Sequence, residues 1–335
     1  MKWIRRAGLA LVSVIVLAVL VGAGYEAAGR RRASKDFPAP GKLVDIGGRR
    51  IQIDCRGSGS PTVVFEAGLD MGGSLSWSGV HDSIAKTTRA CAYSRAGVMW
   101  SDSKDGSQTG KTVAEDLHLA LAKAGERPPF VMVGHSLGGP YVMIYTKYFG
   151  SEVAGLVFVD ATHPEQVERF RSLTPFTLAA AMKPMRVGAW FRRVGLVRKV
   201  AAADSAPPEP NSAVRGTAAY ASTSLPAMLK EVDGFNQTLA EAGSFRQLGN
   251  RPLFVLTAMA PMSKSDLAMM KMTPAQGQQY KARWLELHND EASWSSCSQR
   301  QSVDSGHYIQ FEKPQVVIAA VRSVINSVRS GQCHT

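Results

Sequence analysis

The sequence predicts an α/β protein whose mostly parallel sheet is covered by helices on both faces. Apolar segments rich in β-branched residues alternate with segments of helical spacing through the first half of the chain. Residues 130–139 are the most informative, because a β-branched apolar run leads into Gly-x-Ser-x-Gly and then into an apolar helix. The alternation stops after about residue 161 and resumes near residue 249, which predicts one domain carrying an insertion.

The individual elements follow from local patterns. Residues 43–46 and 50–54 alternate apolar and polar side chains around Gly47 and Gly48, which predicts a hairpin. The other expected strands are 62–65, 90–93, the run that begins at 130, 155–159, 252–256 and 302–303. The expected helices are 77–86, 112–124, the apolar run near 141–145, 279–289 and 314–328, the last of which begins with proline.

The first forty residues form a separate unit. Residues 7–24 carry no charge, and as a helix they would be about 27 Å long, which is sufficient for the hydrocarbon of a bilayer. Residues 1–24 are therefore either an uncleaved membrane anchor or a signal peptide cleaved near Ala23, and the length of the run favours the anchor. We expect residues 25–40 to be a polar linker. Both interpretations export the remainder of the chain.

The net charge is strongly positive, at +12 for 335 residues. Residues 1–36 account for +5 and the remainder for +7. No nucleic-acid recognition motif accompanies this charge, so we expect attraction to an anionic membrane surface and no binding to nucleic acid.

The Gly-x-Ser-x-Gly segment predicts a nucleophile. A strand, a sharp turn and a helix place the Ser136 hydroxyl at the carboxyl edge of the sheet and direct the N-terminus of the helix toward it. Side chains at Gly134 and Gly138 would collide with the neighbouring strand and helix.

These features together resemble the α/β-hydrolase superfamily, specifically its serine esterase and lipase-like branch with a cap domain. The segments that carry the resemblance are 63–69, 92–97, the Ser136 turn, 157–160 and 306–307, in the family's order. The resemblance implies an eight-stranded sheet with a helical cap inserted after the sixth strand. The hydrolase core would then comprise 41–161 and 249–335, and the cap 162–248.

A serine hydroxyl needs a base and a group that orients the base. The resemblance assigns the base to His307, after the last strand. In the family that this chain resembles, the acid usually lies in the loop after the seventh strand. Here that loop has no carboxylate before Asp266, so the acid is less well defined. Asp160, at the end of the sixth strand, is the preferred candidate, with Asp266 and Asp304 as alternatives. The N–H groups of Leu69 and Leu137 are expected to form the oxyanion hole.

The four cysteines suit an oxidising compartment. In the family's sheet, the strands that hold Cys55 and Cys91 are neighbours, so the resemblance implies a disulfide between them. Cys297 and Cys333 flank the last strand and helix and are candidates for a second disulfide. The alternative is four free, buried thiols.

The first half of residues 162–248 interleaves arginine and lysine with aromatic and aliphatic side chains. Such a pattern is typical of a helix that lies on a membrane surface, of one that borders an apolar substrate cleft, or of a solvated helix packed on the core.

The expected function is a serine hydrolase that cleaves carboxylic esters through an acyl-enzyme, with Ser136, His307 and Asp160 as the triad. The substrate would be a small-molecule or lipid-like ester, and the catalytic domain extracytoplasmic, either membrane-anchored or secreted. No residue spacing suggests a metal site or a cofactor. A peptidase or amidase of the same fold and a non-catalytic binding protein are the alternatives, whereas a serine nucleophile argues against the dehalogenase branch. The oligomeric state is left open.

Overall fold

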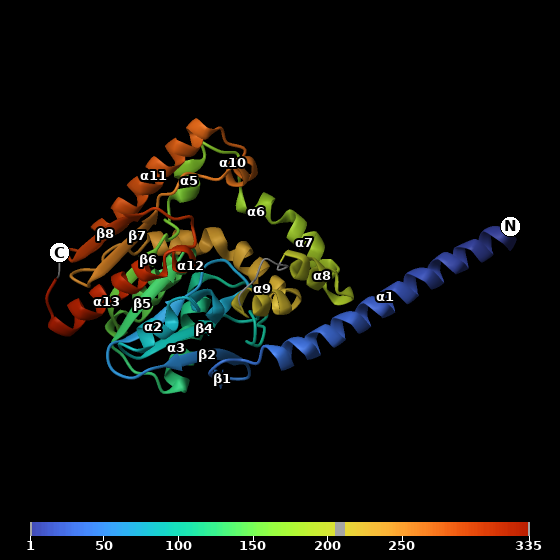
Figure 1. Cartoon of the computed structure of the whole chain (residues 1–335), viewed down its shortest axis with the longest axis horizontal. Coiled ribbons are helices and arrows are strands. Elements are labelled where there is room, and N and C mark those ends of the chain that lie inside the picture. Colours follow the sequence, from blue (N-terminus) through green and yellow to red (C-terminus); the bar gives the residue numbers. More distant parts are fainter. Residues whose placement is uncertain (1, 205–211, 334–335) are drawn as a thin grey trace.

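A computed structural model describes residues 2–204 and 212–333 of the chain. Its centre is an eight-stranded sheet in the order β1-β2-β4-β3-β5-β6-β7-β8 (Figure 1). The strands are β1 (Lys42–Asp45), β2 (Arg50–Arg56), β3 (Thr62–Glu66), β4 (Ala90–Ser94), β5 (Phe130–His135), β6 (Val153–Val159), β7 (Leu253–Ala258) and β8 (Ser298–Val303). The β1–β2 and β2–β4 pairings are antiparallel and the other five are parallel, so the predicted mostly parallel sheet and its N-terminal hairpin are confirmed.

Helices cover both faces of this sheet because the buried strands present apolar side chains to each face alternately. In β3, Val63 and Phe65 belong to one apolar cluster and Val64 to the other. The first cluster is covered by α2 (His81–Ala85) and α13 (Pro314–Ser330), and the second by α3 (Gly110–Ala124), α4 (Gly138–Tyr148) and the end of α11 (Pro274–Ser293).

Two expected elements differ from the observed ones. The helix predicted over 77–86 is reduced to the 3-10 turn η1 (Gly73–Trp77) and the short helix α2. The polar segment 25–40 was expected to be a linker, but its residues up to 36 are helical and continue the apolar helix as α1 (Lys2–Asp36). The first turns after the apolar run keep helical hydrogen bonding because α1 packs there against other helices.

Between β6 and β7 lies a helical insert, residues 162–248, at the position expected for a cap. It comprises α5 (Gln166–Phe170), α6 (Leu178–Ala181), α7 (Lys183–Trp190), the turn η3 (Arg192–Val194), α8 (Leu196–Asp204) and α9 (Ser212–Gly243). Residues 205–211 of this segment fall outside the described residues. Figure 1 shows α8 beside α1, which projects away from the sheet. The remaining helical elements are η2 (Gly150–Glu152), α10 (Lys264–Met270) and α12 (Ile309–Glu312).

Helix α1 is long and apolar enough to cross a membrane, and its most apolar 18-residue window is wholly exposed. Two disulfides join cysteines 36 residues apart, Cys55 to Cys91 and Cys297 to Cys333. Both predicted pairings are therefore present. The first disulfide links β2 directly to the neighbouring strand β4, because Cys55 and Cys91 are paired in the strand register.

Candidate active site

Ser136 occupies the sharp turn between β5 and α4. Its backbone φ of 51° lies in the left-handed region, which residues other than glycine adopt at a cost of about 1 kcal/mol. The turn is held by hydrogen bonds from the Ser136 N–H to the Val159 carbonyl and from the Thr162 N–H to the Ser136 carbonyl, at 3.2 and 2.9 Å.

The glycines around Ser136 are required by close packing, as the sequence predicted. A Cβ at Gly134 would lie 2.5 Å from the carbonyl oxygen of Gly138, and a Cβ at Gly138 would collide with that of Glu66. The strand, the turn and the helix therefore approach one another too closely for any side chain at these two positions.

His307 and Asp160 come together although 147 residues separate them. His307 Nδ1 lies 2.7 Å from Asp160 Oδ2, and the histidine side chain is 43% exposed whereas the aspartate is 4% exposed. Asp160 follows β6 and His307 follows β8, so the loops that carry them leave the same edge of the sheet as Ser136. The sheet thus brings the three predicted triad residues to one edge.

Neither alternative acid occupies an equivalent place. Asp266 caps the N-terminus of α10, where it forms a reciprocal pair of hydrogen bonds with Ser263. Asp304 is exposed. Among the described carboxylates, Asp160 is the one that is hydrogen-bonded to His307.

Asp160 is held in place by two further donors. The indole Nε1–H of Trp284, in α11, and the backbone N–H of Ala258 both donate to Oδ1 at 2.8 Å. Burial by itself would raise the pKa of Asp160, but the hydrogen bond and the charge of His307 outweigh burial and lower the pKa to about 2. The carboxylate is therefore ionised at neutral pH. Nothing in the local sequence of α11 pointed to Trp284, which reaches Asp160 only through the fold.

His135 supports the loop that carries His307. Its Nε2–H donates to the carbonyl of His307 at 3.1 Å, and the two ring centroids are 4.7 Å apart. Burial and the neighbouring His307 lower the pKa of His135 to about 3, so its ring is neutral at pH 7. A neutral ring adds no positive charge beside His307.

The loop before His307 is held from its other end by α12. Glu312 Oε2 accepts from the Gly306 N–H at 2.8 Å and from the Ser305 hydroxyl at 3.1 Å. The loop that leads to His307 thus depends on a glutamate that sequence reasoning did not single out.

Of the two predicted oxyanion donors, Leu137 directly follows Ser136 and Leu69 lies in the turn after β3. Neither the N–H of Leu69 nor that of Leu137 has an acceptor in the described part of the chain. The turn that holds Leu69 is close to the nucleophile, since a Cβ at Gly68 would lie 3.0 Å from the Cβ of Ser136.

A buried arginine braces that turn. Arg95, 4% exposed, donates to the carbonyls of Ala67 and Gly68 at 2.7 and 2.6 Å. The same guanidinium pairs with Glu66 at 2.7 Å and with Glu231 of α9 at 2.8 Å. A fully buried arginine persists only with such complete hydrogen bonding, and its partners link the turn after β3 to the helical insert.

Comparison with known proteins identifies the family. Residues 47–320 match the model of the alpha/beta hydrolase family. The chain belongs to this family. The solved structure of an esterase from Thermogutta terrifontis is similar to this alpha/beta hydrolase. The similarity covers 86% of this chain and 98% of the esterase, at 17% sequence identity and a TM-score of 0.60. Est816, an N-acyl homoserine lactone degrading enzyme, is similar over 84% of this chain and 99% of its own, at 19% identity and a TM-score of 0.56.

Sequence relatives match a smaller part. The protein YbdG of Bacillus subtilis (strain 168) is 26% identical over 132 residues, which are 39% of this alpha/beta hydrolase and 41% of YbdG. The chain thus spans less than half the length of this curated relative.

A cleft of about 900 Å³ adjoins the candidate site of this alpha/beta hydrolase. Leu69, which carries a candidate oxyanion donor, and Tyr308, which follows His307, both line it. Its other walls come from residues 70–79, α8, α9 and α12 and are mainly apolar, including Met71, Leu75, Val214, Met228 and Phe311.

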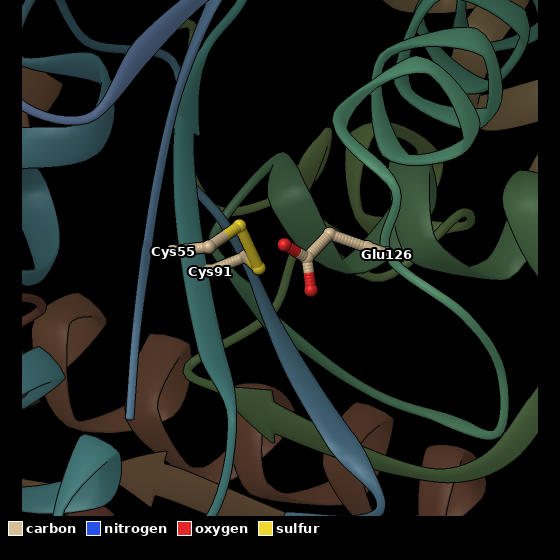
Figure 2. Close-up of side chains that lie close together, drawn as sticks. All are labelled: Cys55, Cys91 and Glu126. Atoms are coloured by element: carbon tan, nitrogen blue, oxygen red, sulfur yellow. A yellow bond between two sulfur atoms is a disulfide. The ribbon is translucent and has the colours of Figure 1, made fainter. Parts of the chain in front are cut away.

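One group of side chains in the described residues has the proximity of a metal site: Cys55, Cys91 and Glu126 (Figure 2). The two sulfur atoms are bonded to each other, and Glu126 forms an ion pair with Arg89 at 2.6 Å. A metal needs thiolates, so this group does not have the chemistry of a metal centre while the disulfide is intact.

Proposed function

We propose that this alpha/beta hydrolase is a serine esterase, which cleaves carboxylic esters through an acyl-enzyme. The observation that carries the proposal is the 2.7 Å hydrogen bond between His307 and a buried, ionised Asp160, on the sheet edge where the strained turn presents Ser136. Nucleophile, base and orienting acid are then in the roles that acyl transfer needs.

In the proposed reaction, Ser136 Oγ attacks the ester carbonyl while His307 Nε2 takes the hydroxyl proton. Asp160 accepts from His307 Nδ1–H and stabilises the imidazolium that forms. The N–H groups of Leu69 and Leu137 bind the oxyanion of the tetrahedral intermediate. His307 then protonates the leaving alcohol, and a water molecule attacks the acyl-enzyme by the same route and releases the acid.

The cleft beside the site favours an apolar substrate group. Its volume of about 900 Å³ and its methionine, leucine, valine and phenylalanine walls suit a small-molecule or lipid-like ester rather than a charged one. The helical insert supplies part of these walls through α8 and α9, which supports its role as the cap of a core formed by 41–161 and 249–335.

The location we propose is extracytoplasmic, with residues 1–24 as a membrane anchor. The exposed apolar window of α1 and the two disulfides support it, since structural disulfides persist in oxidising compartments.

Labelling with a fluorophosphonate probe tests the enzymatic proposal. The full chain in detergent is compared with Ser136→Ala, Asp160→Asn and Asp266→Asn. We expect strong labelling of the wild type and of Asp266→Asn, none of Ser136→Ala, and labelling slowed at least about a hundredfold in Asp160→Asn. A folded wild type that is not labelled would refute the proposal. Turnover of matched nitrophenyl ester and anilide substrates then separates an esterase from an amidase.

A further inference from the structure

A buried ion pair fixes the N-terminal helix to the helical insert. Glu26 of α1 is 1% exposed, and its carboxylate accepts from the Arg198 guanidinium of α8 at 2.9 Å and from the Ser222 hydroxyl of α9 at 2.6 Å. Arg30 adds a third contact at 3.1 Å. A buried carboxylate with three donors sets one position of α1 relative to the insert, because displacement would leave the charge unpaired.

Glycine residues let α1 and the helical insert approach each other closely beside this ion pair. A Cβ at Gly22 would lie 2.7 Å from the Val194 carbonyl oxygen, and Cβ atoms at Gly29 and Gly195 would collide with Arg198 and Tyr25. The turn η3 and helix α8 therefore lie level with residues 22–29 of α1, just where its uncharged run 7–24 ends (Figure 1).

This contact fixes the depth of the insert relative to a bilayer. At 1.5 Å per residue, Gly29 lies only about 8 Å beyond the end of the apolar run. A groove of about 410 Å³ between the two parts is lined on one side by Ile15 and Val19, deeper in the run, and on the other by Leu196 and Lys199. When α1 crosses a membrane, η3 and the start of α8 lie at the headgroup level.

The side chains at this level suit a lipid interface. We call residues 185–200 the insert face. Its large apolar side chains are unusually exposed, with Trp190 at 86% and Val187 at 60%, beside Met185, Phe191, Leu196 and Val200. Arg192, Arg193 and Lys199 form no ion pair with any carboxylate of the described residues. Exposed tryptophan and aliphatic groups among unpaired cations are typical of a helix that lies in the headgroup region.

We propose that the insert face docks on an anionic bilayer surface, the same one that α1 enters. Arg192 and Arg193 contact lipid phosphates, and with Arg186 and Trp190 they line a groove of about 510 Å³ that accommodates headgroups. Trp190 and Val187 enter the acyl boundary. The inference rests on the proposal that α1 is a membrane anchor and is independent of the esterase chemistry.

This arrangement has a consequence for substrate access. Helix α8 passes from the insert face at Leu196 to the substrate cleft, whose wall includes Ala201. Ala201 lies about one and a half turns along α8 from Leu196 and directly follows the insert face, so an ester that partitions into lipid would lie close to the cleft.

Hydrogen exchange of the full chain in lipid nanodiscs tests the docking. Nanodiscs of phosphatidylcholine alone are compared with nanodiscs that contain phosphatidylglycerol. We expect amide exchange in 185–200 to slow about tenfold with the anionic lipid, and this protection to be lost in the triple variant Arg192→Gln, Arg193→Gln, Lys199→Gln. The charge-matched control is Lys123→Gln, Arg127→Gln, Arg300→Gln, whose three residues are exposed and lie outside the insert; it should keep the protection.

A second measurement covers the apolar contact. Lipids with brominated acyl chains quench the fluorescence of tryptophans that enter the bilayer. The difference in quenching between the wild type and Trp190→Phe then measures the quenching of Trp190 itself. The proposal is overturned if residues 185–200 exchange equally in both lipids and Trp190 is not quenched while residues 7–24 are protected. If residues 7–24 are unprotected as well, the membrane anchor fails together with the docking. Neither result alters the outcome of the fluorophosphonate labelling.

Discussion

Arg95 Nη2 donates a 2.6 Å hydrogen bond to the carbonyl of Gly68, in the same peptide group as the N–H of Leu69. A trans peptide is planar and its C=O and N–H point in opposite directions. A guanidinium that holds the carbonyl therefore directs the N–H away from Arg95. Its positive charge also polarises the peptide and makes the N–H a stronger donor. Arg95 is buried and does not line the cleft, so it positions and strengthens one of the two candidate oxyanion donors from behind the turn.

We expect Arg95→Lys to lower kcat about tenfold or more with little change in KM, because one lysine amine cannot satisfy two carbonyls and two carboxylates at once. Glu231→Gln should lower kcat less, since Arg95 keeps Glu66. The matched control is Arg89→Lys. Arg89 precedes β4, whereas Arg95 follows β4. Arg89 pairs with Glu126 and the Gly57 carbonyl at the opposite edge of the sheet. Equal losses in both lysine variants would show a general stability effect.

Trp284→Phe should slow turnover about tenfold. The substitution keeps an aromatic ring but removes the 2.8 Å hydrogen bond to Asp160, and a bond to a charged group contributes about 1.5 kcal/mol. Ester hydrolysis measures the effect. Trp294→Phe is the comparison, because it removes a similar indole bond, to Asp290, at the C-terminus of the same helix. We expect it to leave kcat within about twofold.

Glu312 is expected to act through the position of His307. Glu312→Ala removes the acceptor for the Gly306 N–H and the Ser305 hydroxyl, so kcat should fall several-fold, and Glu312→Gln should restore part of it because an amide oxygen still accepts. Asp304→Ala removes an exposed carboxylate from the same loop and should have little effect. A strong loss in Asp304→Ala would instead revive Asp304 as the acid.

The depressed pKa of Asp160 predicts a specific acid sensitivity. An ordinary aspartate titrates near 3.8, and this one titrates at about 2 in the folded protein. As pH falls, the unfolded state therefore binds this proton before the folded state does. The ionised Asp160 thus stabilises the folded protein above pH 3.8, and this contribution is lost as pH falls through 2. It amounts to about 2 kcal/mol. Urea unfolding between pH 5 and pH 2 should show a steeper loss of stability in the wild type than in Asp160→Asn. Parallel curves would contradict the assignment.

The order of strands and helices was predictable from the sequence because it depends on local patterns. The β-branched run that ends in Gly-x-Ser-x-Gly specifies a strand, a turn and a helix. Gly134 is required by contacts within this turn, whereas Gly138 is required by the close approach of Glu66 in β3. Ser136 could be placed from this local pattern, whereas His307 was assigned by the family resemblance, which expects the base in the loop after the last strand. The segment 77–86 was less predictable, since its apolar residues pack in a short helix and a 3-10 turn rather than along one helical face.

The tertiary structure was needed to show which of Asp160, Asp266 and Asp304 lies beside His307. Each lies in a loop near a strand end, and only the folded sheet places one of them 2.7 Å from His307. The same holds for Trp284, Arg95 and Glu312, whose partners lie at a distance along the chain or in another element. Local patterning of apolar and polar residues determines which elements form. Hydrogen bonds to buried charges depend on which elements meet, and only long-range packing decides that.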